Sequence, residues 1–390
     1  MNTRNEDIDG LRYGSNCSLP VQSSGRSYYP MNWRIGIFLA LVLAAMGQPA
    51  RAVDITDQRG RSVAFEKLPQ RVVFLPIPGP ATFIAVDGSE RKIVGMNAHS
   101  ASAMREGLLG RMFPGFARIP TNVVMGAGDP SNFNPNVESI LALRPDAVFQ
   151  WATSVSGDVI DVLDRTGVPV LGMRAGSQED LAGFITVMGQ VAGDEARAAD
   201  LLARQEQVMR KLESAMSGAP DLQRPRVIYF SRAAQTLRVG GKRSHSDFYI
   251  RLAGGQNVAS EIGAANTVTI EQVLAWNPQT ILLGNFDTAM PSDIYDDPRW
   301  QGVEAVKNRR VYKMPLGGYR WDPPSQESAL TWMWLAGLLH PELAQINLRA
   351  AMREWFTFLY KHDLTDDEID AILSAPRNRQ SAGYDRYLAR

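Results

Sequence analysis

From residue 54 onward, short continuous apolar runs alternate with segments whose apolar residues recur every three or four positions. Such runs are typical of buried strands, and the wider spacing is typical of amphipathic helices. In the first half of the chain the pattern predicts strands at 71–75, 92–96, 147–151 and 168–173, and helices at 81–86, 137–143 and 159–165. A small hairpin is expected before them, at 54–65, with its turn at Arg59 and Gly60. Alternating strands and helices indicate a parallel sheet covered on both faces.

The pattern changes between residues 178 and 216, where helical spacing continues without a strand-like run. Residues 178–190 predict one helix, and 194–216 predict a second that would reach roughly 35 Å at 1.5 Å per residue. The alternation then resumes, with strands expected at 226–230, 280–283 and 311–314, and helices at 247–253, 270–276 and from 325 to the end. The predicted fold class is α/β, with two Rossmann-like lobes, each on a parallel central sheet, joined by one long backbone α-helix. The expected divisions are 53–177 for the N-terminal lobe, 178–218 for the linking helices and 219–390 for the C-terminal lobe with its helical tail.

One segment occurs in both halves. Residues 137–149 match residues 270–282 at an offset of 133, with Glu, Leu, Ala and Pro at the same places. Any helix–proline–strand unit has some of this pattern, but two similar lobes account for it better.

The N-terminal region has the pattern of a secretory signal. After Met31 come a basic residue, an apolar run from Ile35 to Met46, and an A-x-A sequence ending at Ala52. The run is too short to span a bilayer, which needs about 20 residues. We therefore expect residues 1–52 to be an upstream segment plus signal peptide, with translation starting at Met31 and cleavage after Ala52.

Cysteine usage and charge exclude several classes of function. Cys17, the single cysteine, precedes the expected cleavage, so the mature chain would have no disulfide, thiolate metal site, cysteine nucleophile or lipid-bearing cysteine. This predicts a periplasmic protein without a lipid anchor. With 41 basic and 41 acidic residues, the chain has no excess positive charge to attract nucleic acid. The common hydrolase, metalloprotease, phosphate-loop and dinucleotide motifs are absent from the sequence, so no enzyme activity is expected; an enzyme of unknown reaction is the non-transport alternative.

Several segments, in this order and spacing, resemble a known family. They are 138–146, the helix from 194, 226–230, 253–257, 271–278, 297–302 and 305–312, and the tail segments 321–325, 334–341 and 363–368. Over roughly residues 54–341 the chain is similar to the cluster-A, helical-backbone (TroA-like) periplasmic binding proteins of ABC importers, which serve ferric siderophores, haem, cobalamin, metals or oxyanions.

The resemblance implies a monomer that binds a solute in a cleft between the lobes and delivers it to an inner-membrane permease and its ATPase. The long helix would act as a stiff hinge, so closure should be small. No cofactor is expected. The expected ligand is an iron complex, a ferric siderophore; haem, cobalamin, or a metal or oxyanion are the alternatives.

The resemblance also implies the docking residues. Glu138 and Glu271 match the glutamates that pair with permease arginines, and two equivalent carboxylates suit a two-fold symmetric partner. Alternatively, each simply stabilises a helix N-terminus.

Ligand-binding side chains are expected on loops that follow the carboxyl ends of strands. Arginine forks suit anionic oxygens and aromatic faces suit ligand rings, which selects Trp151, Arg232, Arg243, Tyr319, Arg320 and Trp321. No metal site is predicted, although His99 and His245 fall on loops of opposite lobes and could face one cleft; a hydrogen-bonding role is the commoner outcome for such histidines.

Overall fold

The computed structural model describes Gly25 and residues 53–389, except 126–133, 153–156, 175, 218–223 and 264. The expected signal peptide and Cys17 lie outside the described residues. Arg51–Arg390 forms one compact unit. In the part of the chain described, no helix is both long and apolar enough to cross a membrane.

The N-terminal lobe is built on a four-stranded parallel sheet in the order β4-β3-β5-β6. The predicted hairpin is confirmed as β1 (Val53–Thr56) and β2 (Ser62–Phe65). The sheet strands are β3 (Val72–Phe74), β4 (Ile93–Met96), β5 (Ala147–Trp151) and β6 (Val170–Met173). The helices are α2 (Gly79–Asp87), α3 (Ala98–Glu106), α4 (Leu109–Met112), α5 (Val137–Ala142) and α6 (Gly157–Asp164). Helix α2 starts before the predicted residue 81 because Pro80 is tolerated in a first helical turn.

The C-terminal lobe holds a six-stranded sheet in the order β10-β8-β7-β11-β12, with β9 paired to β7. Its strands are β7 (Arg226–Arg232), β8 (Arg238–Gly240), β9 (Gln256–Asn257), β10 (Ala265–Thr267), β11 (Thr280–Leu283) and β12 (Val311–Lys313). β8 and β10 are antiparallel to their neighbours, so this sheet is mixed and not wholly parallel as expected. Residues 233–237 are too few for the crossover that a parallel pair would need, so β8 returns as a hairpin.

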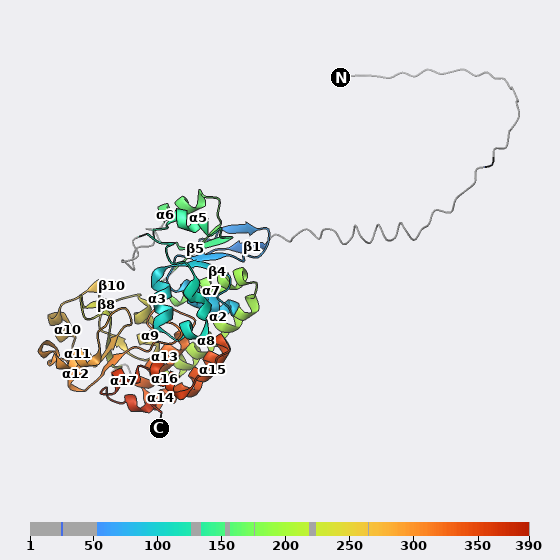
Figure 1. Cartoon of the computed structure of the whole chain (residues 1–390). Helices are drawn as coiled ribbons and strands as arrows, with labels where there is room; N and C mark the ends of the chain where they lie inside the picture. Colours follow the sequence, from blue (N-terminus) through green and yellow to red (C-terminus); the bar gives the residue numbers. More distant parts are fainter. Residues whose placement is uncertain are drawn as a thin grey trace, which may run out of the picture. The chain divides into compact units, whose positions relative to one another are not determined.

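Helices surround this second sheet and form the tail. They are α9 (His245–Leu252), α10 (Ile270–Trp276), α11 (Pro291–Asp296), α12 (Glu304–Lys307), α13 (Ser328–Leu339), α14 (Pro341–Ala344), α15 (Leu348–Tyr360), α16 (Asp366–Ile372) and α17 (Ala375–Asn378). All residues of α13 are buried, which places this helix in the centre of the C-terminal lobe (Figure 1).

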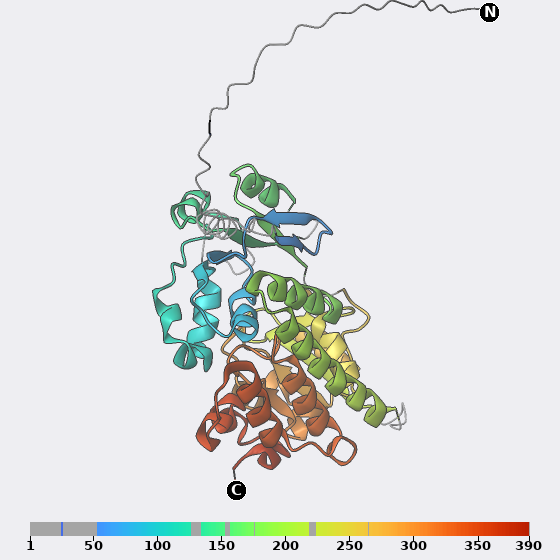
Figure 2. The same ribbon diagram turned by 90° about the vertical axis from the view of Figure 1, so that its right-hand side faces the viewer.

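Two consecutive helices connect the sheets. α7 (Gln178–Ala192) ends at Gly193, whose φ of 76° is accessible to glycine at little cost. Asp194 then caps α8 (Glu195–Met216), its side chain accepting from the Arg197 backbone N–H. At 22 residues, α8 confirms the predicted backbone helix and extends roughly 33 Å. Figure 2 shows α7 and α8 side by side.

The core explains why the strands are continuously apolar. In β7, Val227 and Tyr229 face a cluster that also contains α7, α8, α13 and α15 side chains, whereas Ile228 and Phe230 face a second cluster. β3 divides in the same way between the large cluster and a third one. Because successive residues of a strand point to opposite faces, a sheet covered on both faces needs apolar residues at every position.

A buried lysine holds the loop after β11. Lys313 is 2% exposed, and its Nζ donates to the carbonyl oxygens of Gly284 (2.7 Å), Asp287 (3.0 Å) and Ala289 (3.2 Å). Burial lowers the pKa of this amine below its ordinary value.

We expect Lys313→Met to lower the free energy of unfolding by about 2 kcal/mol, because it leaves those carbonyls without their charged donor. Urea denaturation measures this loss. Lys307→Met, at an exposed position of α12, is the control and should change the stability by less than about 0.5 kcal/mol. Equal losses in both variants would contradict the role of Lys313.

Candidate functional site

The two lobes meet where α3 ends. The Leu108 backbone N–H donates to the Gly317 carbonyl oxygen across the lobes at 2.8 Å. A Cβ on Gly107 would come within 2.6 Å of the Gly318 carbonyl oxygen, so glycine is needed for this close approach. Beside it, Arg320 Nη2 forms an ion pair with Glu106 Oε2 at 2.8 Å. Backbone and charged contacts together therefore join the N-terminal lobe to the loop after β12.

One face of α3 looks toward the C-terminal lobe. His99, Ser102 and Glu106 are spaced three and four residues apart and so share that face. Ser102 Oγ donates to Glu106 Oε1 at 3.0 Å, and Glu106 reaches Arg320. His99 Nε2 is buried and has no hydrogen-bond partner among the described residues. This polar face begins close to the carboxyl end of β4, where ligand groups are expected.

Arg320 lies on the C-terminal side of this contact. Its guanidinium lies 4.8 Å from the centre of the Phe286 ring, and its Nε is buried with no hydrogen-bond partner in the described part of the chain. Burial disfavours the charged form, but the hydrogen bond to Glu106 and nearby negative groups outweigh it and raise the pKa of Arg320. This side chain therefore offers a permanent positive charge and one unused N–H donor.

The other two predicted residues of this loop point inward. Tyr319 is 1% exposed and Trp321 is fully buried. The Trp321 Nε1–H donates to Glu327 Oε2 at 2.8 Å, and the Tyr319 backbone N–H donates to Glu327 Oε1 at 3.2 Å. Tyr360 Oη also donates to Glu327. In this structure these contacts fix the loop that carries Arg320, and direct contact of Tyr319 or Trp321 with a ligand stays a prediction.

The remaining predicted ligand residues lie at strand ends or in loops. Trp151 ends β5 and is half-buried, and Arg232 ends β7 and is half-buried. Arg243 is exposed and has a φ of 63° in the turn before α9. Their roles stay predictions.

His245 begins α9 and is 8% exposed, packed against Phe248 and Tyr249. Burial lowers its pKa to about 3, so the ring is neutral near pH 7. Both ring nitrogens lack a hydrogen-bond partner among the described residues. Within the same residues no group of three or more His, Cys, Asp or Glu side chains could hold a metal ion.

The two predicted docking glutamates occupy equivalent places. Glu138 lies in the first turn of α5 and Glu271 in the first turn of α10, and both are exposed. Hydrogen bonds from Thr269 and from the Glu271 backbone lower the pKa of Glu271, which keeps it ionised.

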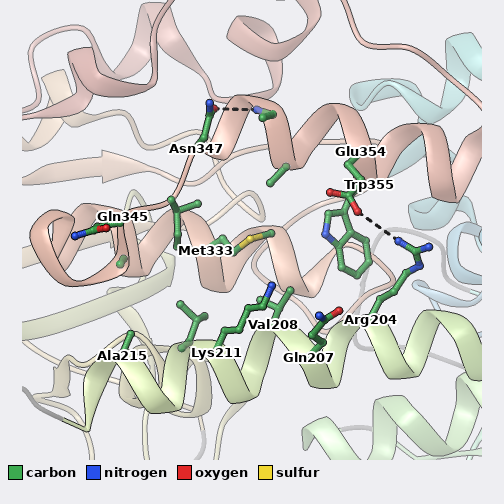
Figure 3. A pocket seen from close by; sticks show the side chains of 15 residues that line it. Arg204, Gln207, Val208, Lys211, Ala215, Met333, Gln345, Asn347, Glu354 and Trp355 are labelled. Atoms are coloured by element: carbon green, nitrogen blue, oxygen red, sulfur yellow. Dashed lines mark hydrogen bonds and ion pairs between the residues drawn. The ribbon is translucent and has the colours of Figure 1, made fainter.

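A hollow of about 450 Å³ lies apart from all these residues. It lies between α8 and the helices α14 and α15, and Figure 3 shows Val208, Met333 and Trp355 along it. The Arg204–Glu354 pair, 3.5 Å apart, lies at one end. Its lining includes neither Glu106 nor Arg320, nor any residue predicted to bind ligand.

Some residues of the inter-lobe contact were not anticipated from sequence. These are Glu106, Gly107 and Glu327, whose contacts join segments distant in sequence, whereas Phe286 lies in the loop after β11 where ligand groups are expected. Near these residues the sequence gives one local indication, Asn97, an N-cap residue that marks the start of α3.

Comparison with known proteins gives concordant matches. A family model described as periplasmic binding protein matches residues 130–316. A periplasmic solute-binding protein from Veillonella parvula is 30% identical, with a TM-score of 0.77, over 84% of this chain and 99% of that one. The molybdate-binding protein MolA of Haemophilus influenzae is 26% identical over 356 residues, which is 85% of this chain and 97% of that protein. The vitamin B12-binding protein of Vibrio parahaemolyticus is 24% identical over 183 residues, 46% of this chain and 63% of that protein.

Proposed function

Because this chain belongs to the periplasmic binding protein family, the solute-binding components of ABC importers, we propose that it carries an oxygen-rich anion of the molybdate type to an inner-membrane permease. As a member of this family it is a binding protein that acts outside the cytoplasm, and not an enzyme. Release of the protein without a lipid anchor is part of the proposal and is supported by the absence of a cysteine after the apolar run at 35–46.

Arg320 is the observation that carries the proposed ligand class. A buried guanidinium with an unused Nε–H donor, at the contact of two lobes, suits an anionic oxygen. The long match to a molybdate-binding protein adds support, and it favours the oxyanion alternative over the ferric siderophore first expected.

A ring-bearing ligand is the second candidate, either a ferric siderophore, haem or cobalamin. The half-buried Trp151 at the end of β5 and the half-buried Phe286 beneath Arg320 support it, because aromatic faces pack against flat rings. The match to a vitamin B12-binding protein points the same way over a shorter stretch.

We expect titration of the purified, ligand-free protein with sodium molybdate to give saturable binding by calorimetry, and Arg320→Ala to weaken it about tenfold or more. Glu106→Gln removes the carboxylate that competes for Arg320 but retains the guanidinium, so this variant should bind molybdate at least as tightly as the wild type. Arg210→Ala, at an exposed arginine of α8, is the control.

The same titration with a ferric catecholate, haemin and cyanocobalamin tests the second candidate. Binding of one of these compounds together with no response to molybdate would overturn the oxyanion proposal and leave the transport role intact. No binding of any compound, in protein that folds normally, would count against the role itself.

A further inference from the structure

The internal repeat places the same three side chains on the surface of both lobes. In α5 these are Glu138, Leu141 and Ala142, and all three are exposed. In α10 the residues 133 positions later, Glu271, Leu274 and Ala275, are exposed as well. Residues three and four apart lie on one face of a helix, so each lobe presents a carboxylate beside an apolar patch.

The two leucines are not the buried anchors of their helices. The buried anchors of these helices are the preceding residues, Ile140 at 1% and Val273 at 0% exposure. Leu141 is 42% exposed and Leu274 is 38% exposed, two of only five large hydrophobic side chains so exposed among the described residues. A single exposed leucine needs no explanation, but the same leucine beside the same glutamate on both lobes does.

The leucines do not contribute to the N-terminal capping of these helices either. The Asn136 side chain accepts from the Ser139 backbone N–H, and Thr269 accepts from the Gln272 backbone N–H. Leu274 lies against Gly302, where a Cβ would come within 2.8 Å of its Cδ2, so its position is defined. The Glu–Leu–Ala surfaces are therefore held in place by other residues and are free to contact a partner.

We propose that Leu141 and Leu274, with Ala142 and Ala275, are apolar anchors for the permease, each entering a hollow beside the cation that receives the neighbouring glutamate. This proposal rests on the proposed transport function and adds to it the chemistry of the docking partner. Two equivalent surfaces suit a partner with two-fold symmetry, such as a homodimer, because each of its subunits presents the same binding surface.

Charge selects this partner over two others. A second copy of this chain, docked through the same surface, would bring like carboxylates together. An anionic lipid surface would repel the same carboxylates. A protein with cations beside an apolar hollow satisfies both parts of each surface.

Photo-crosslinking in native cells tests the partner. A benzophenone amino acid is placed at position 141, 274 or, as the control, 343, because Leu343 is 43% exposed on α14. We expect adducts with the ABC permease subunit, identified by peptide mass, from positions 141 and 274 and none from 343. Adducts only with a second copy of this chain, or equal permease adducts from all three positions, would overturn the proposal.

Substitution of the leucines measures how much each contributes to the affinity for the permease. Leu141→Ser and Leu274→Ser should each weaken binding of immobilised protein to the detergent-solubilised permease about fivefold, and the double variant about 25-fold, since independent contacts multiply. Leu343→Ser should leave the affinity within about twofold, and all variants should remain folded at the assay temperature, with the loss of stability from Leu343→Ser similar to that from Leu141→Ser and Leu274→Ser because the three leucines are similarly exposed.

The outcomes separate the two proposals. If wild-type protein binds the permease and the double variant binds equally well, only the leucine proposal fails. If the wild-type protein binds neither the permease nor any solute tested, the proposed transport function is wrong. The leucine proposal, which rests on it, is then wrong as well.

Discussion

Replacing Glu138 and Glu271 together by alanine is expected to lower import by about two orders of magnitude and to leave solute affinity unchanged. Both carboxylates are exposed, in the first turns of α5 and α10. Exposed charges of this kind orient the encounter with a partner of opposite charge and raise its rate, whereas the proposed solute contact is made by Arg320. Uptake of labelled solute by cells measures import, and calorimetry on the purified variant measures affinity.

The matched control is Glu342→Ala, because Glu342 is also an exposed first-turn glutamate, on α14. It should import at the wild-type rate. Binding of the wild-type protein to its permease should also weaken with rising salt, since exposed charges are screened. A collapse of solute affinity in the double alanine variant would show that the docking assignment is wrong.

The stability of this protein is expected to decrease between about pH 4.5 and pH 7 through one buried carboxyl group, Glu327. Burial raises its pKa from 4.5 to about 7, although Tyr360, Trp321 and Tyr319 all donate to it. Within this window the folded state holds the proton more tightly than the unfolded state, so the free energy of unfolding falls as pH rises. The contribution is full below pH 4.5 and is lost through pH 7, a change of about 3 kcal/mol for a shift of this size.

Chemical denaturation at pH 4.5 and pH 8 tests this expectation. Glu327→Gln, which cannot titrate, should reduce the difference between the two pH values by about 3 kcal/mol, whereas the exposed Glu342→Gln should not change it. Tyr360→Phe removes a donor that lowers the pKa of Glu327, so the loss of stability should move to higher pH. An unchanged pH dependence in Glu327→Gln would mean that this carboxyl group is ionised throughout the range.

Glu327 is also a support for the proposed solute site. It holds the backbone of Tyr319 and the ring of Trp321, the residues on either side of Arg320. The neighbouring Gln326 Oε1 accepts from Thr82 Oγ1 of α2 at 2.9 Å, so α2 of the N-terminal lobe contacts the segment just before α13. The site and the joint between the lobes therefore share one buried polar network, and a change at Glu327 should reach both.

Local pattern in the sequence determined which elements form. The strand at 147–151, the helix at 270–276 and the strand at 280–283 were predicted at the bounds that the structure has. These elements are strongly apolar or regularly spaced, and the proline between α10 and β11 separates them, so neighbouring residues suffice to define them. The repeat at an offset of 133 likewise pointed to two related lobes.

Only the tertiary structure decided how the sheet edges and the site are arranged. β8 and β10 are three residues each, too short and too polar to show a period, and they form strands because β8 pairs with β7 and β10 then pairs with β8. The Arg320–Glu106 pair joins residues 214 positions apart, and the raised pKa of Glu327 comes from burial among α13, α15 and the 317–321 loop. Such features depend on which distant segments pack together, because a charge or a donor acquires its properties from its neighbours in space and not from its neighbours in sequence.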